Sequence, residues 1–224
     1  MFVKQGVYGM AADRRQVELL EKNRPRQARA KRTYEAILTA ASELLVEVGV
    51  ERISTNLIAE RAGVTVPALY RYFPNKYAVL NALGAAMMDH QNAVFDEWFE
   101  THAQQGDPHV LLANIYDLLK QTYDVTVAQP GGLEIIQSLR AVAPLQEVRL
   151  TSHRLVASNF AALLPELLGR PADESMALQA RLTIDMGYAV VEMALEDDQL
   201  APEQTLREGA RVIQYYWQGI LASS

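Results

Sequence analysis

The chain has 224 residues, of which 50% are hydrophobic and 21% are charged, a balance typical of a folded globular protein and unlike that of a disordered or fibrous one. It contains no cysteine, which excludes disulfide bonds, thiolate metal sites and a cysteine nucleophile. The net charge of -6 is unevenly divided, because residues 1–76 carry 13 Lys and Arg against 8 Asp and Glu, whereas residues 77–224 carry 8 against 19. This pattern is typical of a polyanion-binding segment joined to an acidic body, or of a basic tail that only keeps the N-terminus soluble.

The sequence shows no targeting or membrane segment. Its first ten residues are too short and too weakly apolar for a secretory signal, and it has no run of the roughly 18 apolar residues that a membrane span needs. We therefore expect a cytoplasmic protein with no membrane partner.

Helical periodicity runs through the chain, and no segment alternates as a strand would. A first helix is predicted over about residues 27–48, with Gly49 as its C-terminal glycine. Two short helices follow, one from Ser54 and Thr55 to Ala62 and one from Thr65 to about Tyr72. Longer helices are predicted at about residues 76–102, 109–128, 132–142, 145–168, 173–195 and 203–222, because Gly and Pro punctuate the chain between them. The expected fold class is all-α.

The segment from Ser54 to Thr65 has the internal pattern of a helix-turn-helix. Ala59 and Ala62 allow two short helices to approach closely, and Gly63 suits a left-handed turn between them. The helix that begins at Thr65 is then free to lie in a major groove of DNA.

The residues Ile58-Ala59-Glu60-Arg61-Ala62-Gly63-Val64-Thr65, followed by Leu69-Tyr70-Arg71-Tyr72-Phe73-Pro74-Asn75-Lys76, resemble the TetR/AcrR family of bacterial regulators, over about Tyr34 to Leu83. Beyond that segment only the number, length and placement of helices agree. The resemblance implies an N-terminal DNA-binding domain and a C-terminal domain that binds an effector and forms dimers. It also implies release from a palindromic operator when the effector binds.

Several residues of this segment are predicted to contact the DNA backbone. Lys76 lies in the first turn of a helix, where the helix dipole disfavours a cation, and the family pattern puts a phosphate contact there. Tyr70 and Tyr72 have hydroxyls suited to phosphate oxygens, although one of them could instead be a packing residue, as Lys76 could be merely solvated. Thr55 is predicted to cap its helix, to contact the backbone, or both.

The first turn of the third helix departs from the family pattern, because Val66-Pro67-Ala68 stands where a glycine followed by Ser or Thr is more usual. Proline is tolerated in a first helical turn, so the fold is not affected. A methyl group cannot form a polar base contact, which favours contact with thymine methyl groups. Thr65 and Arg71 are the remaining candidates for reading the bases.

The segment before the first helix is rich in Arg and Lys and is expected to follow the DNA backbone, to enter a minor groove, or to act as a mobile basic tail with only nonspecific affinity. Its basic residues are Arg24, Arg26, Arg29, Lys31 and Arg32.

No catalytic pattern is present in the sequence. The four histidines are not spaced as metal ligands, and neither a glycine-rich phosphate loop nor a nucleophile elbow occurs. We therefore expect no enzymatic activity, no metal and no cofactor.

A ligand pocket is predicted in the C-terminal part, from isolated polar residues on apolar helix faces. Each polar residue could equally be satisfied within a core or at a subunit interface, and Arg181 could simply pair with Asp185 one turn away. The candidate lining residues are Met87, Gln91, Phe95, Trp98, Ser152, Asn159, Asp185 and Tyr188.

The last two helices have more apolar surface than one core requires. Along the final helix, one stripe runs from Leu206 to Ile220, and Val212, Tyr216 and Gly219 form a second. A second apolar face predicts a homodimer through these helices, packed against the Leu182 to Leu195 segment of another copy, and its two-fold symmetry would match a palindromic operator.

The sequence thus predicts three segments: a basic extension over residues 1–26, a three-helix helix-turn-helix domain over 27–79, and a helical effector-binding and dimerisation domain over 80–224. The expected function is that of a repressor of transcription that binds a double-stranded DNA operator and is released by a small, largely apolar effector. The alternative is a DNA-binding organiser or activator without a small-molecule ligand.

Overall fold

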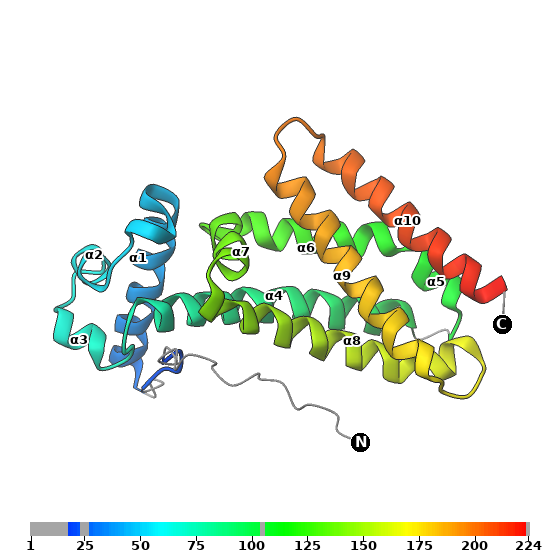
Figure 1. Ribbon diagram of the computed structural model, residues 1–224, viewed down its shortest axis with the longest axis horizontal. Coiled ribbons are helices and arrows are strands. Elements are labelled where there is room, and N and C mark those ends of the chain that lie inside the picture. Colours follow the sequence, from blue (N-terminus) through cyan, green and yellow to red (C-terminus); the bar gives the residue numbers. More distant parts are fainter. Residues whose placement is uncertain (1–17, 23–26, 104–105, 223–224) are drawn as a thin grey trace, which may run out of the picture.

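The computed structural model describes residues 18–22, 27–103 and 106–222, and these residues form an all-α protein without strands. Three helices form one end of the molecule (Figure 1). They are α1 (Ala28–Arg52), α2 (Thr55–Arg61) and α3 (Val66–Tyr70). The larger part contains α4 (Lys76–Ala103), α5 (Pro108–Ala113), α6 (Ile115–Ala128), α7 (Gly132–Ala141), the 3-10 turn η1 (Ala143–Leu145), α8 (Gln146–Leu168), α9 (Glu174–Glu196) and α10 (Pro202–Ala222).

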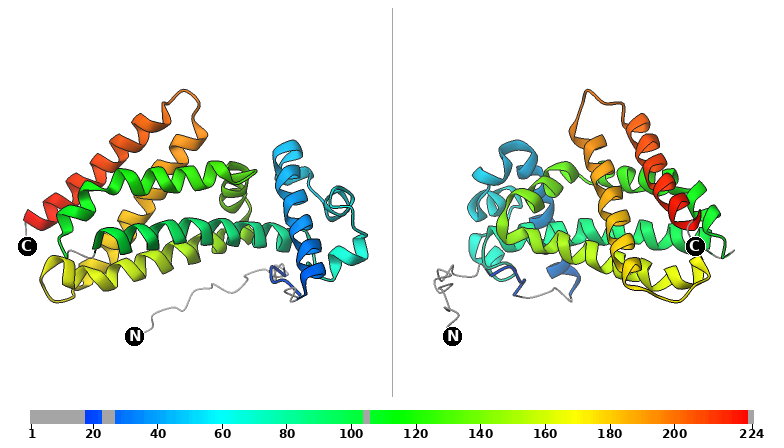
Figure 2. Two further views of the ribbon diagram at one scale, coloured as in Figure 1. Left: turned by 180° about the vertical axis from the view of Figure 1, so that it is seen from behind. Right: turned by 45° about the vertical axis from the view of Figure 1, so that its right-hand side comes forward.

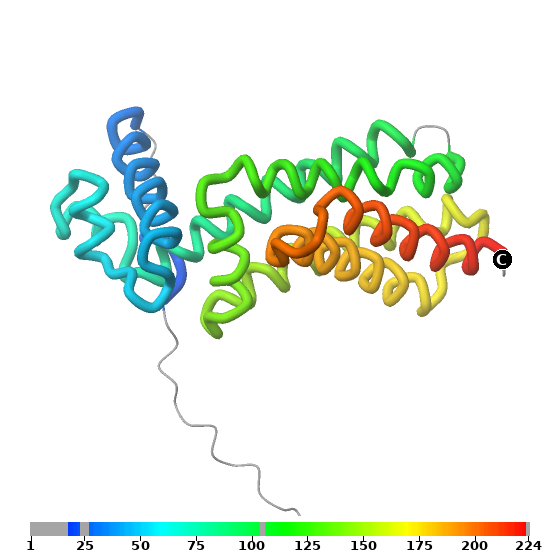
Figure 3. Tube along the Cα trace, turned by 90° about the horizontal axis from the view of Figure 1, so that it is seen from above, coloured from blue at the N-terminus to red at the C-terminus, as the bar shows by residue number. Residues whose placement is uncertain are grey.

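The long helix α4 connects the two parts. It begins beside α1 and runs the length of the larger part next to α6 and α8, while α9 and α10 pack together on the far side of that part (Figures 1 and 2). Seen from above, α1 to α3 project from one end of the helical bundle (Figure 3). A helix with one end in the small part and the other in the large part is a direct mechanical link between them.

A single apolar cluster joins the small part to the larger one, and we call it the junction cluster. It is built on Ile37 and Leu45 of α1 together with Phe73, and it continues to Leu139 of α7 and Leu145 of η1. All five side chains are fully buried. The predicted boundary between residues 79 and 80 lies within α4 and inside this cluster, so the division into domains stays a prediction.

Most predicted helix positions are confirmed, with two differences. Gly49 has a φ of 72°, as expected of a terminating glycine, and one more helical turn follows it to Arg52. The helix expected over residues 109–128 is two helices, α5 and α6, because the chain breaks at Asn114. There the Asn114 side chain donates to the Val110 carbonyl, and the Asn114 carbonyl accepts from the indole of Trp98, which holds the break in place.

None of the described helices combines the length and the apolar character that a membrane span needs.

Candidate nucleic-acid interface and ligand cavity

The helix-turn-helix is held by the residues that the sequence singles out. The Ser54 hydroxyl accepts from the Leu57 amide at 3.3 Å and caps α2, and the Thr65 hydroxyl accepts from the Ala68 amide at the same distance and caps α3. Gly63 has a φ of 65°, a left-handed conformation that a side chain would strain. The cap at Thr65 and the glycine turn are therefore confirmed, whereas the cap of α2 is Ser54 and not Thr55, which is the first residue of that helix.

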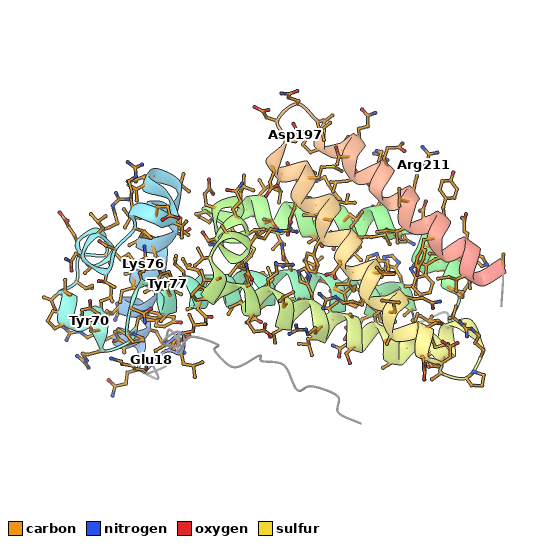
Figure 4. The ribbon with its side chains drawn as sticks, viewed as in Figure 1. Glu18, Tyr70, Lys76, Tyr77, Asp197 and Arg211 are labelled. Carbon is orange, nitrogen blue, oxygen red and sulfur yellow. The ribbon has the colours of Figure 1, made fainter. Side chains whose placement is uncertain are left out.

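The outer side of α3 carries an aromatic, a basic and an apolar group. Tyr70 is 41% exposed, lies at the end of the molecule away from α9 and α10 (Figure 4), and has its hydroxyl 3.2 Å from the hydroxyl of Thr55. Arg71 and Pro67 are exposed and Ala68 is half-buried. Val66 packs partly against the junction cluster, so less of its side chain faces outward than expected. The surface presented by α3 has the mixed character that base and phosphate contacts require.

Tyr72 requires a correction. Only 8% of it is exposed, and its ring packs edge-on against the ring of Tyr34 at a centroid distance of 6.1 Å. Tyr72 is therefore a core residue that anchors α1 to the segment after α3, and of the two tyrosines only Tyr70 remains a candidate for a phosphate contact.

Lys76 also differs from the expectation, because its charge is compensated within the chain. Its Nζ donates to the carbonyl of Val50 at 3.2 Å and to that of Ile53 at 3.1 Å, at the C-terminal end of α1, where a cation is favoured by the helix dipole. The unfavourable position of this lysine in α4 is therefore compensated without a DNA phosphate. A phosphate contact by Lys76 stays a prediction.

The N-terminal part exposes less positive charge than its composition indicates, because one arginine of the motif is paired with two carboxylates. Arg61 donates to Glu47 through both terminal nitrogens, at 2.7 and 2.6 Å, and to Glu43 at 3.3 Å, which raises the pKa of Arg61. These hydrogen bonds also lower the pKa of Glu47. The guanidinium of Arg61 therefore fastens α2 to α1.

The basic segment before α1 is described in part. Arg24 and Arg26 lie outside the described residues, whereas Arg29, Lys31 and Arg32 are exposed on the first turns of α1. Residues 18–22 are attached to the helix-turn-helix, because the Lys22 amide donates to the Tyr72 carbonyl at 2.8 Å and the Asn75 side chain donates to the Glu18 carbonyl at 2.9 Å.

An apolar cavity of about 100 Å³ lies inside the larger part, between α4, α5, α6, α8, α9 and α10. Four of the predicted lining residues line it, namely Gln91, Phe95 and Trp98 of α4 and Tyr188 of α9. Sequence reasoning missed Thr122, Phe160, Thr183 and Trp217, which also line it. An apolar neighbourhood around each was visible in the sequence, but periodicity alone does not tell a residue that faces a cavity from one that faces a neighbouring helix.

The other four predicted lining residues lie elsewhere. Met87 is buried in the junction cluster, and Asn159 is exposed on α8. The hydroxyl of Ser152 donates to the side chain of Asn92, away from the cavity lining. Asp185 accepts from Arg181, one turn away, at 2.6 Å, which is the pairing that the sequence offered as the alternative to a role in the pocket. These four expectations are corrected because each side chain already has another environment.

A buried histidine lies beside the cavity wall. The ring of His153 stacks on Tyr188 with a centroid distance of 4.1 Å, and its Nδ1 is 2.6 Å from the carboxylate of Asp185. Burial lowers the pKa of His153 to about 4, although the Asp185 carboxylate acts in the opposite direction. Burial also raises the pKa of Tyr188. The ring of His153 is therefore neutral at pH 7 and has a packing role.

The outer face formed by α9 and α10 carries exposed apolar side chains among charged ones such as Glu208 and Arg211. Val212 is 58% exposed and Tyr215 is 62% exposed, and Leu182 and Met193 of α9 are exposed near them. Of the predicted second stripe, Val212 and Gly219 face outward, whereas Tyr216 packs into the core and Tyr215 takes its place. Gly209 lets the two helices meet closely, because a Cβ there would lie 2.3 Å from a methyl group of Val190.

No group of His, Asp or Glu among the described residues is arranged to hold a metal ion.

Comparison with known proteins agrees with this arrangement. Residues 37–83 match the family of bacterial regulatory proteins called the tetR family. A tetracycline repressor protein of class C from Escherichia coli is 52% identical over 54 residues, 24% of this chain and 25% of that protein. A nucleoid occlusion factor, SlmA, from Mannheimia succiniciproducens is 28% identical over 107 residues, 47% of each chain. The chain thus spans a quarter to about half of the length of these curated relatives.

The fold of the whole chain is similar to that of a TetR-family transcriptional regulator from Streptomyces coelicolor, with a TM-score of 0.53 and 23% identity over 83% of this chain and 98% of the other. Fold and site together define a helix-turn-helix protein whose larger helical part contains an apolar cavity. More particularly, the part of the chain that matches the tetR family in sequence, residues 37–83, is the part that contains the helix-turn-helix.

Proposed function

We propose that this chain is a ligand-responsive repressor of transcription, which binds a palindromic DNA operator as a homodimer and is released by a small, largely apolar effector. The observation that carries this proposal is the pairing of an outward-facing α3 with an apolar cavity, joined by the single helix α4. A regulator needs such a pair of sites and an element whose position both of them influence.

DNA binding rests on α3 and the segments around it. Tyr70 and Thr55, whose hydroxyls lie side by side, would contact phosphate oxygens, Arg71 and Thr65 are exposed at the two ends of α3, and Arg29 and Lys31 add positive charge on α1. Phosphate contacts position the protein, and α3 reads the base edges in the major groove.

Dimerisation rests on the exposed apolar face of α9 and α10. Packed against the same face of a second copy, Val212 and Tyr215 would be removed from water, and a two-fold axis would present two copies of α3 to successive major grooves. The relative called class C tetracycline repressor supports the repressor class, since its similarity covers the helix-turn-helix.

Effector response rests on the contact between the cavity and the connecting helices. Gln91 of α4 lines the cavity and donates to Thr126 of α6, and Ser42 of α1 donates to the Pro130 carbonyl in the loop after α6. A ligand that shifts Gln91 would therefore act on α4, which packs against α1, and on α6, whose following loop is hydrogen-bonded to α1.

The second candidate is a DNA-binding organiser without a small ligand, and the similarity to the nucleoid occlusion factor favours it. The cavity favours the repressor, because a protein with no ligand has no need of an apolar space between six helices.

The test is a selection of duplex DNA from a random pool, followed by titration of the selected and scrambled duplexes at fixed salt. A specific regulator should bind a two-fold symmetric sequence at least about a thousandfold more tightly than the scrambled one. Equal affinity for both duplexes would rule out operator recognition and favour the organiser.

A further inference from the structure

The cavity wall contains one polar atom that the surrounding protein does not satisfy. Gln91 is only 2% exposed, and its side-chain oxygen Oε1 is buried without a hydrogen-bond partner in the chain. Leaving a buried carbonyl oxygen unpaired is unfavourable, so an unpaired one in a binding cavity indicates what the ligand supplies.

The orientation of the amide is determined by its neighbours. Gln91 Nε2 donates to the hydroxyl of Thr126 at 2.8 Å, and that hydroxyl donates its only proton to the Thr122 carbonyl at 2.8 Å. Thr126 can therefore accept from Gln91 but cannot donate to it. Rotating the amide by 180° would place an acceptor against an acceptor, so Oε1 is the atom left for the cavity.

The other polar side chains in the lining are already engaged. The indoles of Trp98 and Trp217 donate to the Asn114 carbonyl and to Thr183, and Thr122 and Thr183 donate to carbonyls of their own helices. Tyr188 donates to Asn92.

Charge and volume limit the ligand further. None of the described residues that line the cavity is charged, so a carboxylate or an ammonium group would have no counterion there. The volume of about 100 Å³ is close to that of an engineered apolar cavity of roughly 150 Å³ that binds benzene. The cavity as it stands thus holds a molecule of about one ring.

We propose that the cavity recognises a neutral, single-ring-sized apolar molecule by one hydrogen bond, which a hydroxyl or amine N–H of the ligand donates to Gln91 Oε1. This inference rests on the proposed function of the cavity as the effector site. Gln91 is then the specificity-determining residue, since the rest of the cavity wall only excludes water and matches the shape of the ligand.

The test compares phenol with toluene, which has the same shape but a methyl in place of the hydroxyl, by calorimetric titration of the full chain. Because water holds phenol more strongly than toluene, the informative quantity is the ratio of the two affinities, compared between protein variants. In Gln91→Met, which retains the length of the side chain but lacks the acceptor, the phenol-to-toluene ratio should fall about tenfold. Aniline, a second neutral donor, should behave as phenol does.

Thr122→Val is the matched control, because it also removes a polar group from the lining, but one whose proton is already donated to Leu118. It should leave the ratio unchanged. Should Gln91→Met fail to fold, the side-chain carbonyl resonance of Gln91 in the wild-type protein replaces it, and should shift with phenol and aniline but not with toluene.

Both ligands could still bind while the phenol-to-toluene ratio is unchanged in Gln91→Met or the carbonyl resonance does not move. Either result would overturn the proposed hydrogen bond to Gln91 Oε1 and leave the cavity as a purely apolar effector site. If neither phenol nor toluene binds the wild-type protein, the assignment of ligand size and class is overturned. Both outcomes are distinct from a failure of the proposed function, which the DNA titration measures without any ligand.

Discussion

At the scale of single residues, Lys76 shows how one side chain can join two helices. Its ammonium group lies at the C-terminal carbonyls of α1 while its backbone opens α4, and the side chain of Asn75 caps α4 by accepting from the Ala78 amide at 3.0 Å. The cation is thus unfavourable for the helix that carries it and favourable for the helix that it caps. These contacts tie the beginning of α4 to the C-terminal end of α1.

Replacing Lys76 with Met should therefore lower the free energy of unfolding by about 1 kcal/mol, because the C-terminal carbonyls of α1 lose a cation. Denaturant unfolding followed by circular dichroism measures this, with Lys31→Met on the exposed face of α1 as the control. In a DNA titration, the slope of log affinity against log salt should also fall by about one if the lysine neutralises a phosphate. An unchanged stability would show that the capping contacts contribute nothing.

His153 predicts a pH dependence of stability. Its pKa is lowered to about 4 in the folded protein by burial, while an unfolded histidine titrates near 6.5, so between these values the unfolded chain binds more protons and stability falls as pH falls. The groups facing the ring are Asp185 and Arg181 of α9 and Arg149 of its own helix. Burial acts to raise the pKa of Asp185, but hydrogen bonds from Arg181 and His153 lower it overall, so Asp185 titrates below this window.

When the pH is lowered from 7 to 5, the free energy of unfolding should fall by about 2 kcal/mol more in the wild-type protein than in His153→Gln. Urea unfolding of both proteins at the two pH values gives the difference, and the comparison between them cancels the titration of Glu192, whose pKa is raised by burial despite its ion pair with Arg140. Parallel stability profiles in the two proteins would mean that His153 is protonated in the folded state.

At the scale of elements, α3 combines a fixed position with an unusual surface. Its cap at Thr65, the turn at Gly63 and the buried Leu69 hold the helix, whereas Pro67 and Ala68 at its outward first turn offer no hydrogen bond from their side chains. Apolar contact is the interaction left to this turn.

Thymine methyl groups should accordingly be read in each half-site. Replacing a contacted thymine with uracil should weaken binding about fourfold per methyl group, on the free energy of burying one CH₂. Ala68→Ser should show a smaller loss, since its hydroxyl can bond to a base edge. The affinities of both proteins for the thymine and the uracil duplex are measured by titration at fixed salt. If the wild-type protein binds both duplexes equally well, specificity comes from Thr65, Arg71 or DNA shape.

The elements themselves could be predicted from the sequence where the signal is local. The caps at Ser54 and Thr65 and the glycine turn at Gly63 depend on residues within three or four positions, and each is where the sequence placed it. The break at Asn114 could not be predicted, because it depends on the indole of Trp98, 16 residues away and on another helix.

The ligand cavity was predictable only in part, for the same reason. The apolar stripe of α4 correctly placed Gln91, Phe95 and Trp98 on one face. The partner of Gln91, Thr126, is 35 residues away, and nothing in the sequence pairs the two. Asn159 and Asp185 were misplaced, because a polar residue within an apolar helix indicates neither which face it occupies nor whether it is already paired.

At the scale of the whole molecule, the apolar face of α9 and α10 should determine the oligomeric state. Val212→Glu places a carboxylate one turn from Glu208 on this exposed face, and burying it unpaired in a dimer would be costly. The variant should sediment with the 25.0 kDa mass of one chain, and the wild-type protein with about twice that mass.

Leu155→Glu is the matched control, because Leu155 is an exposed apolar residue on α8, outside this face. It should leave the dimer intact. A monomeric wild-type protein at micromolar concentration would contradict the dimer, and a dimer that persists in Val212→Glu would place the contact between copies elsewhere.

The junction cluster limits how this protein can exchange parts with its relatives. Leu139 and Leu145, which lie far along the chain, complete the packing of Ile37 and Phe73 near its beginning. In a chimera that takes residues 27–79 from a relative, the apolar surface of the new segment would not be complementary to the apolar surface of α7 and η1. Recombination at the helix-turn-helix boundary would yield a stable hybrid only if α7 and the turn after it travelled with the new segment, even though more than 50 residues of chain separate them from it.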